Sequence, residues 1–313
     1  MDAPRAELDL SGAEFRELFE RVSNWGRWGS EDERGTLNYL TAERVAAAAG
    51  LVRGGETVSL SRPLDTTAEP SNPDPAEHRM TMLADVDIGS GSLRFCKDYI
   101  GVDYHNDSHS HIDAICHVAF DGSLYNGRPS DLVTANGATA GTVEVLRDGL
   151  VGRGVLLDIP RTRGVDWLEP GEHVLPADLE RAEHEQSVTV GEGDILLIRT
   201  GHARRLDELG PWDTASAKAG LHPSCALFLA DRHISALGSD GNSDTAPSTT
   251  EGVGFPIHAL ALVAMGLHLL DYLHLRKLAA ACERAGRWEF LFAAAPLRIS
   301  GGTGSPLNPI AVL

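Results

Sequence analysis

Histidine and aspartate are concentrated in one short segment of the chain, HNDSHSHIDAICH, at residues 105 to 117. Four of the 13 histidines in this 313-residue chain fall there. Imidazole and carboxylate groups are ligands that Zn²⁺, Mn²⁺ and Fe²⁺ accept, whereas a solvated polar loop more often carries Lys, Glu and Ser. The segment therefore predicts a metal site, and its candidate ligands are His105, Asp107, His109, His111 and Asp113.

Spacing limits how many of these groups share one ion. In an extended chain all five would lie on one face, but His105 and Asp113 would be roughly 26 Å apart. We therefore predict that the backbone folds around the ion, as a coil that enters a helix near Asp113 and places His117 on the same side. His111 and Asp113 are the best-supported pair. His105 and His109 could instead be loop residues, and Asp113 could cap the helix.

Cys116 precedes His117, but neighbours in sequence point apart on a helix or a strand, so a Cys-His nucleophile couple is not expected. A second pair of candidates lies far along the chain. His258 follows Pro256 at the start of an apolar helix, where it could simply face solvent. Asp271 has apolar surroundings, so its carboxylate needs a cation or a metal nearby.

Candidates for substrate binding are of two kinds. Aromatic side chains could stack on a planar substrate or could be ordinary packing residues. Polar groups in the glycine-rich turn LGSDGNSD could bind substrate or only form turn hydrogen bonds. The aromatic candidates are Trp25, Trp28 and Tyr125, and the polar ones are Asp240 and Ser243, with Asn242 between them.

The elements that must position these groups alternate between strands and helices, which indicates a mixed α/β (α+β) domain. A proline-rich polar stretch from 65 to 87 predicts a long surface loop. The predicted strands are Thr57 to Leu60, Gly154 to Ile159, Ile195 to Arg199 and Ile234 to Gly238. The predicted helices are Gly12 to Val22, Ala42 to Val52 capped by Thr41, Pro176 to His184, Ser224 to Arg232, His258 to Met265 and Leu275 to Arg284.

Charge and cysteine content narrow the function classes. Lys and Arg number 27 and Asp and Glu 45, a net charge of −18 that disfavours binding to nucleic acid and to anionic membranes. The four cysteines are far apart, so neither disulfides nor a thiolate zinc site is indicated. The first residues carry acidic groups, unlike a signal peptide, and no apolar run is long enough to cross a membrane. We expect a cytoplasmic protein that acts on a small molecule.

The string SHIDAICH, residues 110 to 117, resembles the second half of the motif H-x-G-T-H-x-D-x-P-x-H. This motif marks the cyclase family of metal-dependent hydrolases, which includes bacterial kynurenine formamidases and isatin hydrolase. Other segments resemble successive blocks of that family and cover most of the chain: NWGRWGSEDERGTLNYL, HVAFDGSLYNG, RGVLLDIPR, GDILLIRTG, LGSDGNSD and FPIHALALVAMGLHLLDYL.

The resemblance implies a swivelling β/β/α fold, here a single domain over 1–313 with a helical and loop extension at 1–55. It also implies a homodimer or homotetramer with one or two divalent ions, Zn²⁺ or Mn²⁺. Carried over by motif position, the implied ligands are Asp107, His111, Asp113, His258 and Asp271, and His117 shuttles protons. Asp107 replaces the first histidine of the motif, so His105 or His109 could be the third ligand instead.

The implied chemistry is hydrolysis of a carbon–nitrogen bond in a formamide, lactam or imide by water that the ion activates. His117 would take the proton of that water and deliver it to the departing nitrogen. Two alternatives stay open. One is a natural-product cyclase or dehydratase that uses the ion as a Lewis acid, and the other is a metal-free binding protein on the same fold.

Overall fold

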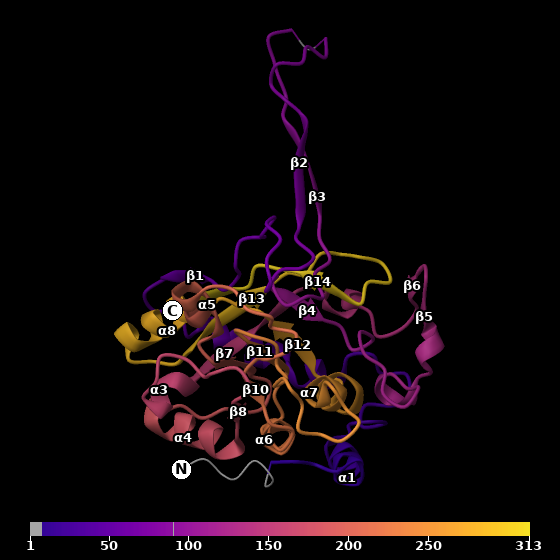
Figure 1. Cartoon of the computed structure of the whole chain (residues 1–313), viewed down its shortest axis with the longest axis vertical. Coiled ribbons are helices and arrows are strands. Elements are labelled where there is room, and N and C mark those ends of the chain that lie inside the picture. Colours follow the sequence, from indigo (N-terminus) through magenta and orange to yellow (C-terminus); the bar gives the residue numbers. More distant parts are fainter. Residues whose placement is uncertain (1–7, 90) are drawn as a thin grey trace.

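A mixed β-sheet organises the chain in the computed structural model, which describes residues 8–89 and 91–313 (Figure 1). Within that part, nine strands follow the order β1-β15-β13-β7-β9-β11-β12-β4-β14. The strands are β1 (Thr57–Ser59), β4 (His111–Asp113), β7 (Leu150–Asp158), β9 (Ile195–Arg199), β11 (Ala236–Ser239), β12 (His268–Asp271), β13 (Glu289–Ala294), β14 (Gly304–Pro306) and β15 (Ile310–Val312).

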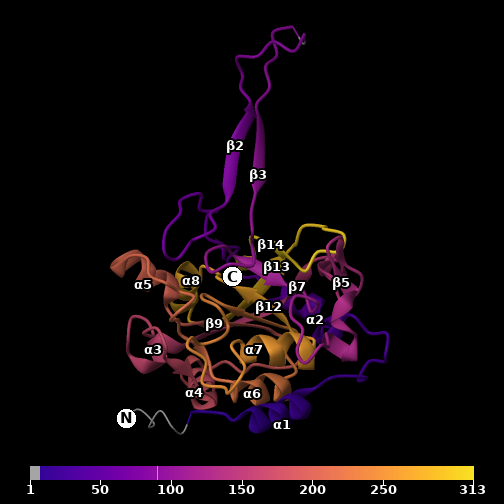
Figure 2. The ribbon, with the colours of Figure 1, turned by 45° about the vertical axis from the view of Figure 1, so that its right-hand side comes forward.

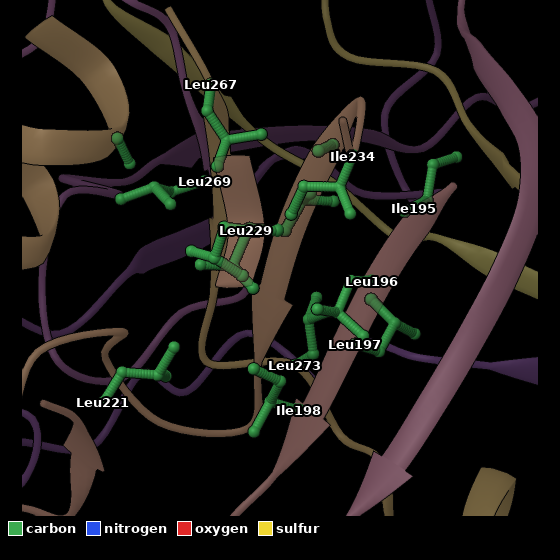
Figure 3. Packing of buried hydrophobic residues seen from close by; sticks show 14 of the residues in the cluster. Ile195, Leu196, Leu197, Ile198, Leu221, Leu229, Ile234, Leu267, Leu269 and Leu273 are labelled. Atoms are coloured by element: carbon green, nitrogen blue, oxygen red, sulfur yellow. The ribbon is translucent and has the colours of Figure 1, made fainter. Parts of the chain in front are cut away.

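Four central strands, β7, β9, β11 and β12, run parallel, and the flanking strands pair antiparallel. The whole of β9 is buried, as expected for a parallel strand covered on both faces. Figure 3 shows the leucines and isoleucines of β9 beside Ile234, Leu269 and Leu273 in one apolar cluster. The mixed α/β fold class predicted from the sequence is confirmed.

Helices surround the sheet, and most lie where the sequence predicts them. Helix α1 has the predicted bounds, and Ser11 forms a capping box with Glu14 at its start. Thr41 caps α2 as predicted, but this helix ends three residues earlier than expected, at Ala49. The helices are α1 (Gly12–Val22), α2 (Ala42–Ala49), α3 (Ile159–Arg163), α4 (Pro176–Gln186), α5 (His202–Leu209), α6 (Cys225–Asp231), α7 (Pro256–His258) and α8 (Arg276–Ala285).

Several shorter elements connect these. The predicted helix from His258 to Met265 is instead the end of α7 followed by a π-helix, η6 (Ala259–Met265). The 3-10 turns are η2 (Gly35–Tyr39), η3 (Tyr125–Gly127), η4 (Ser130–Leu132) and η5 (Val143–Leu146). The two-residue strands are β5 (Val133–Thr134), β6 (Gly137–Ala138), β8 (His173–Val174) and β10 (Gly220–Leu221).

The prediction of a helix near Asp113 is wrong. His111 to Asp113 form the buried strand β4, which pairs with β12 on one side and β14 on the other. The chain then turns, and the amide of His117 donates to the carbonyl of Ala114. Pairing on both edges, which the local sequence does not reveal, stabilises three residues as a strand.

Most of the polar stretch from 65 to 87 is exposed as predicted, although Ser71, Asn72 and Ala76 are buried, and it is not only a loop. It contains β2 (Glu77–Met82), which pairs antiparallel with β3 (Lys97–Gly101). The resulting hairpin projects away from the rest of the molecule (Figures 1 and 2).

The predicted extension at 1–55 and the predicted lack of a membrane span were two further expectations. Phe15, Leu18 and Val22 of α1 join the main core, while the division of the chain at residue 55 stays a prediction. Among the described residues, none of the helices has the length and apolar character needed to cross a membrane.

Candidate metal centre

Two neighbouring strands bring together three of the predicted site residues. His111 and Asp113 are two residues apart on β4, so their side chains leave the same face of the sheet. In the antiparallel register of β4 and β12, Asp271 lies directly opposite His111. Cross-strand partners carry their Cβ atoms about 5 Å apart, which brings their side chains within reach of one ion.

Asp113 is the centre of the cluster, and each of its oxygens faces a different group of side chains. Oδ1 lies 2.8 Å from Nδ1 of His105 and 3.5 Å from Nε2 of His111. Oδ2 lies 3.5 Å from Nε2 of His258, and that same nitrogen is 3.5 Å from Oδ2 of Asp271. Two groups of three possible ligands result, His105/His111/Asp113 and Asp113/His258/Asp271.

The outer nitrogens of all three histidines are engaged, which orients the inner nitrogens toward Asp113. Nδ1 of His111 donates to the carbonyl of His109 at 2.7 Å, and Nδ1 of His258 is 2.6 Å from Oδ2 of Asp244. Nε2 of His105 is 3.0 Å from the hydroxyl of Thr303. Metal-binding histidines in proteins are held in this way by a carbonyl or carboxylate behind the ring.

The chemistry of the cluster fits a divalent cation. Both oxygens of Asp113, Oδ2 of Asp271 and Nδ1 of His105 are buried without a hydrogen-bond partner among the described residues. Buried polar atoms without partners are costly, and a cation at each of the two groups of ligands would satisfy these four atoms. Ligand atoms about 2.1 Å from one ion lie about 3.0 to 3.4 Å from each other, close to the separations seen here.

The ionisable groups of the cluster shift one another's pKa values. Burial opposes ionisation of Asp113, but the adjacent His111, His105 and His258 outweigh it and hold the pKa of Asp113 well below its usual value. Burial also raises the pKa of Asp271. The carboxylates of Asp113, Asp244 and Asp271 raise the pKa of His258 well above its ordinary value despite its burial. The cluster thus concentrates negative charge that attracts a cation.

Asp107, predicted as a ligand, makes different contacts. Its Oδ1 lies 3.0 Å from Nζ of Lys218 and accepts a hydrogen bond from the hydroxyl of Tyr272 at 2.5 Å. Burial would raise the pKa of Asp107, but Lys218 and Tyr272 together lower it. The structure brings His105, one of the two alternates, into the cluster, while His109 lies outside it with both ring nitrogens buried. Ligation by Asp107 stays a prediction.

A cavity of about 220 Å³ opens beside the cluster. His117, the predicted proton shuttle, lies in its wall and stacks on His105 with ring centroids 3.7 Å apart. Burial lowers the pKa of His117 to about 4. Phe255 and Val118 supply apolar wall, and Asn242 supplies an amide. The possible metal ligands and His117 therefore line the same cavity.

Asp240 and Ser243, the polar candidates of the glycine-rich turn, form hydrogen bonds with neighbouring residues. Asp240 accepts hydrogen bonds from the backbone of Thr200 and Gly201, and the hydroxyl of Ser243 donates to Oδ1 of Asp271 at 2.7 Å. Both contacts hold the edge of the site in place. A direct role of Asp240 and Ser243 in substrate binding stays a prediction.

The three aromatic candidates lie apart from the cavity lining. The indole of Trp25 donates to the carbonyl of Val263, Trp28 packs edge-on against Tyr39, and the hydroxyl of Tyr125 donates to Asp32. Their predicted stacking on a substrate stays a prediction.

Sequence reasoning missed Asp244, Lys218, Phe255 and Thr303. Asp244 also accepts the amides of Ile257 and His258, so it fixes the start of α7 as well as the ring of His258. Its place in the motif LGSDGNSD was the available signal. No local sequence pattern indicates Lys218 or Thr303. Lys218 is 111 residues away in sequence from its partner Asp107, and Thr303 is 198 residues away from its partner His105.

Comparisons with known proteins identify the family of this chain. The family model Cyclase, described as "Putative cyclase", matches residues 58–244. A solved structure described as a novel cyclase shares 34% identity, with a TM-score of 0.86 over 94% of this chain and 99% of that one. No curated protein matches the chain.

More distant structures share the fold. Isatin hydrolase A from Labrenzia aggregata is 22% identical, with a TM-score of 0.57 over 84% of this chain and 94% of its own. A "predicted metal-dependent hydrolase" from Bacillus stearothermophilus is 18% identical, with a TM-score of 0.52 over 83% of this chain and 98% of its own. With the family model matching more than half of its length, the chain belongs to the cyclase family.

Proposed function

We propose that this protein is a metal-dependent hydrolase that cleaves a carbon–nitrogen bond of a small formamide or cyclic amide. The observation that supports this most directly is Asp113, whose two buried oxygens lack hydrogen-bond partners and face histidine nitrogens on both sides. The solved neighbours include isatin hydrolases and a predicted metal-dependent hydrolase, which supports the reaction class.

His105, His111 and Asp113 would hold one Zn²⁺ or Mn²⁺ ion, and Asp113, His258 and Asp271 offer a second group of ligands. A divalent ion bound there would supply a Lewis acid able to polarise a carbonyl and to lower the pKa of water. His117 accepts the proton of the attacking water and returns it to the leaving nitrogen, because its ring lines the cavity beside the cluster. Phe255 and Val118 exclude water from one wall and pack on the substrate.

The test is a panel of N-formyl arylamines, isatin-like lactams and cyclic imides, assayed by mass spectrometry with the purified protein. The proposal predicts a product heavier than its substrate by one water, activity lost with a chelator, and activity restored by Zn²⁺ or Mn²⁺. His117→Ala should keep its metal content and slow turnover by about 10²- to 10⁴-fold.

Other outcomes contradict the proposal. A product lighter by one water would indicate a cyclase or dehydratase. That alternative stays open because Asp107 and His109 stand where the family motif has its first histidine and its glycine. A protein that folds normally, retains no divalent metal and turns over none of the panel would indicate a binding protein.

A further inference from the structure

An ion pair lies in the wall of the cavity beside the metal cluster. Asp107 lines that cavity, and Nζ of Lys218 lies 3.0 Å and 3.2 Å from its two carboxylate oxygens. The side chain of Lys218 is 3% exposed and that of Asp107 is 18% exposed, so the carboxylate is the partner that faces the cavity. Among the described residues, neither group of possible metal ligands includes Asp107. The carboxylate is therefore placed to meet a ligand rather than the ion.

The carboxylate of Asp107 is held in one orientation. Oδ1 accepts hydrogen bonds from Nζ of Lys218 and from the hydroxyl of Tyr272, which lies 2.5 Å away, and Lys218 also approaches Oδ2. A carboxylate offers about four acceptor sites on its two oxygens, so these contacts do not exhaust it. A further donor can reach the carboxylate from the cavity that it lines.

Tyr272 is itself held in place. Its backbone adopts a φ of 55°, a left-handed conformation that is costly for a bulky residue and is found most often at functional sites. Its amide donates to the carbonyl of Gly241 at 3.0 Å, and its carbonyl accepts from the hydroxyl of Ser110 at 2.6 Å. The ring of His202 packs edge-on against the Tyr272 ring. These contacts direct the Tyr272 hydroxyl at Asp107.

The charges at this wall favour a neutral donor on the ligand. Lys218 compensates the charge of Asp107, so a cationic group would meet the ammonium of Lys218 beside the carboxylate and be repelled. A neutral N–H group meets the acceptor without that repulsion. The possible metal ligands line the same cavity. One amide group carries both a carbonyl oxygen, which suits the ion, and an N–H, which suits Asp107.

We propose that Asp107 is a specificity-determining residue that accepts a hydrogen bond from the N–H of the scissile amide. Lys218 and Tyr272 are positioning residues that hold its carboxylate toward the cavity. The preferred substrates are amides with a hydrogen on the nitrogen, whereas esters, lactones and N-alkylated amides offer the carboxylate no donor. This inference rests on the proposed hydrolase function, because it assigns the substrate class of the same site.

The test compares two ligands of nearly the same shape, 2-oxindole and 2-indanone. In 2-indanone a CH₂ group replaces the N–H beside the carbonyl. Isothermal titration calorimetry of the full-length protein, with Zn²⁺ in excess, measures both affinities without requiring turnover. We expect the wild type to bind 2-oxindole at least about tenfold more tightly than 2-indanone, which corresponds to one hydrogen bond to a charged acceptor.

Asp107→Asn is the diagnostic variant. Because Lys218 and Tyr272 both donate hydrogen bonds, the introduced amide turns its oxygen toward them and its NH₂ group toward the cavity. That NH₂ group opposes the N–H of 2-oxindole, so the variant should lose the preference for 2-oxindole. Asp103→Asn makes the same change at an exposed carboxylate outside the cavity lining and should keep the preference. Circular dichroism checks that both variants are folded.

Three results would overturn the proposal. They are a wild type that binds the two ligands equally or binds neither, an Asp107 variant that keeps the wild-type preference, and an Asp103 variant that loses it to the same extent. The wild-type comparison needs no variant, so it tests the proposal even where a substitution prevents folding. Hydrolysis of the amide panel by a protein with no preference for 2-oxindole would overturn this inference and leave the hydrolase function standing.

Discussion

At the scale of single residues, the contacts of Asp107 and His105 differ from those that the family motif implies. Asp107 occupies the position of the first motif histidine, yet it pairs with Lys218 and Tyr272. His105, two residues earlier, turns its Nδ1 toward Asp113. We therefore propose the imidazole of His105 as the third ligand, in place of the carboxylate of Asp107.

The proposed assignment of His105 as the third ligand predicts different effects of two substitutions on metal affinity. His105→Asn removes a ligand and should weaken binding of Zn²⁺ or Mn²⁺ by at least about 100-fold, whereas Asp107→Asn should weaken it by less than about tenfold. Competition with a chromogenic chelator measures both. Loss of metal in the Asp107 variant, with affinity retained in the His105 variant, would restore Asp107 as the ligand.

The Lys218–Asp107 pair carries its own prediction for stability. Lys218→Met leaves the carboxylate of Asp107 largely buried beside an apolar side chain, so it should lower the free energy of unfolding by about 3 kcal/mol. Adding Asp107→Asn should recover most of that loss, because the uncompensated charge is gone. Urea unfolding measures both variants. A Lys218 variant as stable as the wild type would show that Asp107 does not need the charge of Lys218 in the folded protein.

At the scale of elements, the site depends on three residues of β4 held between two other strands. Gly304 of β14 lies opposite Asp113. A Cβ added at Gly304 would come 2.3 Å from the carbonyl oxygen of Ile112 and 2.8 Å from the ring of His105. Only glycine lets the β14 backbone approach this closely, and the same contact sets the place of the His105 ring.

Gly304→Ala should therefore lower the free energy of unfolding by about 1 to 3 kcal/mol and also weaken metal binding, since the strand and the His105 ring must both move. Gly254→Ala is the matched control, because a Cβ there meets nothing within 4 Å. Urea unfolding and chelator competition are the measurements. Equal behaviour of the two alanine variants would show that β14 does not position His105.

The sequence was sufficient for elements with strong local patterns. The capped helix α1 and the apolar strand β9 were predicted with their observed bounds. The sequence was insufficient for β4. Its three residues, His111 to Asp113, form a strand only because they pair with β12 and β14. The same reason explains the site: His111 and Asp113 were evident from their spacing, whereas Lys218 and Thr303 reach it through the tertiary fold.

At the scale of the whole molecule, buried histidines set the response to pH. Burial lowers the pKa of His202 to about 3, and burial lowers the pKa of His268 to about 4. In the unfolded chain both rings titrate near 6.5. The folded state therefore prefers their neutral form, and the stability they contribute is complete above about pH 6.5 and is lost as the pH falls.

Each of these histidines should lower the free energy of unfolding by about 1.4 kcal/mol between pH 7.5 and 5.5. His202→Gln removes one of them, so the variant should lose about 1.4 kcal/mol less than the wild type over that interval. Urea unfolding at the two pH values gives the difference directly, whatever the stability of the variant at pH 7.5. Equal losses would show that folding does not lower the pKa of His202.

The central claim is that Asp113 and the histidines around it hold a divalent cation. An anomalous-scattering map from crystals grown with Mn²⁺ or Zn²⁺ tests it most directly. We predict a peak within about 2.3 Å of Asp113, Nδ1 of His105 and Nε2 of His111. A map with no peak at Asp113, or with its peak beside Asp107 and Lys218 instead, would contradict the claim.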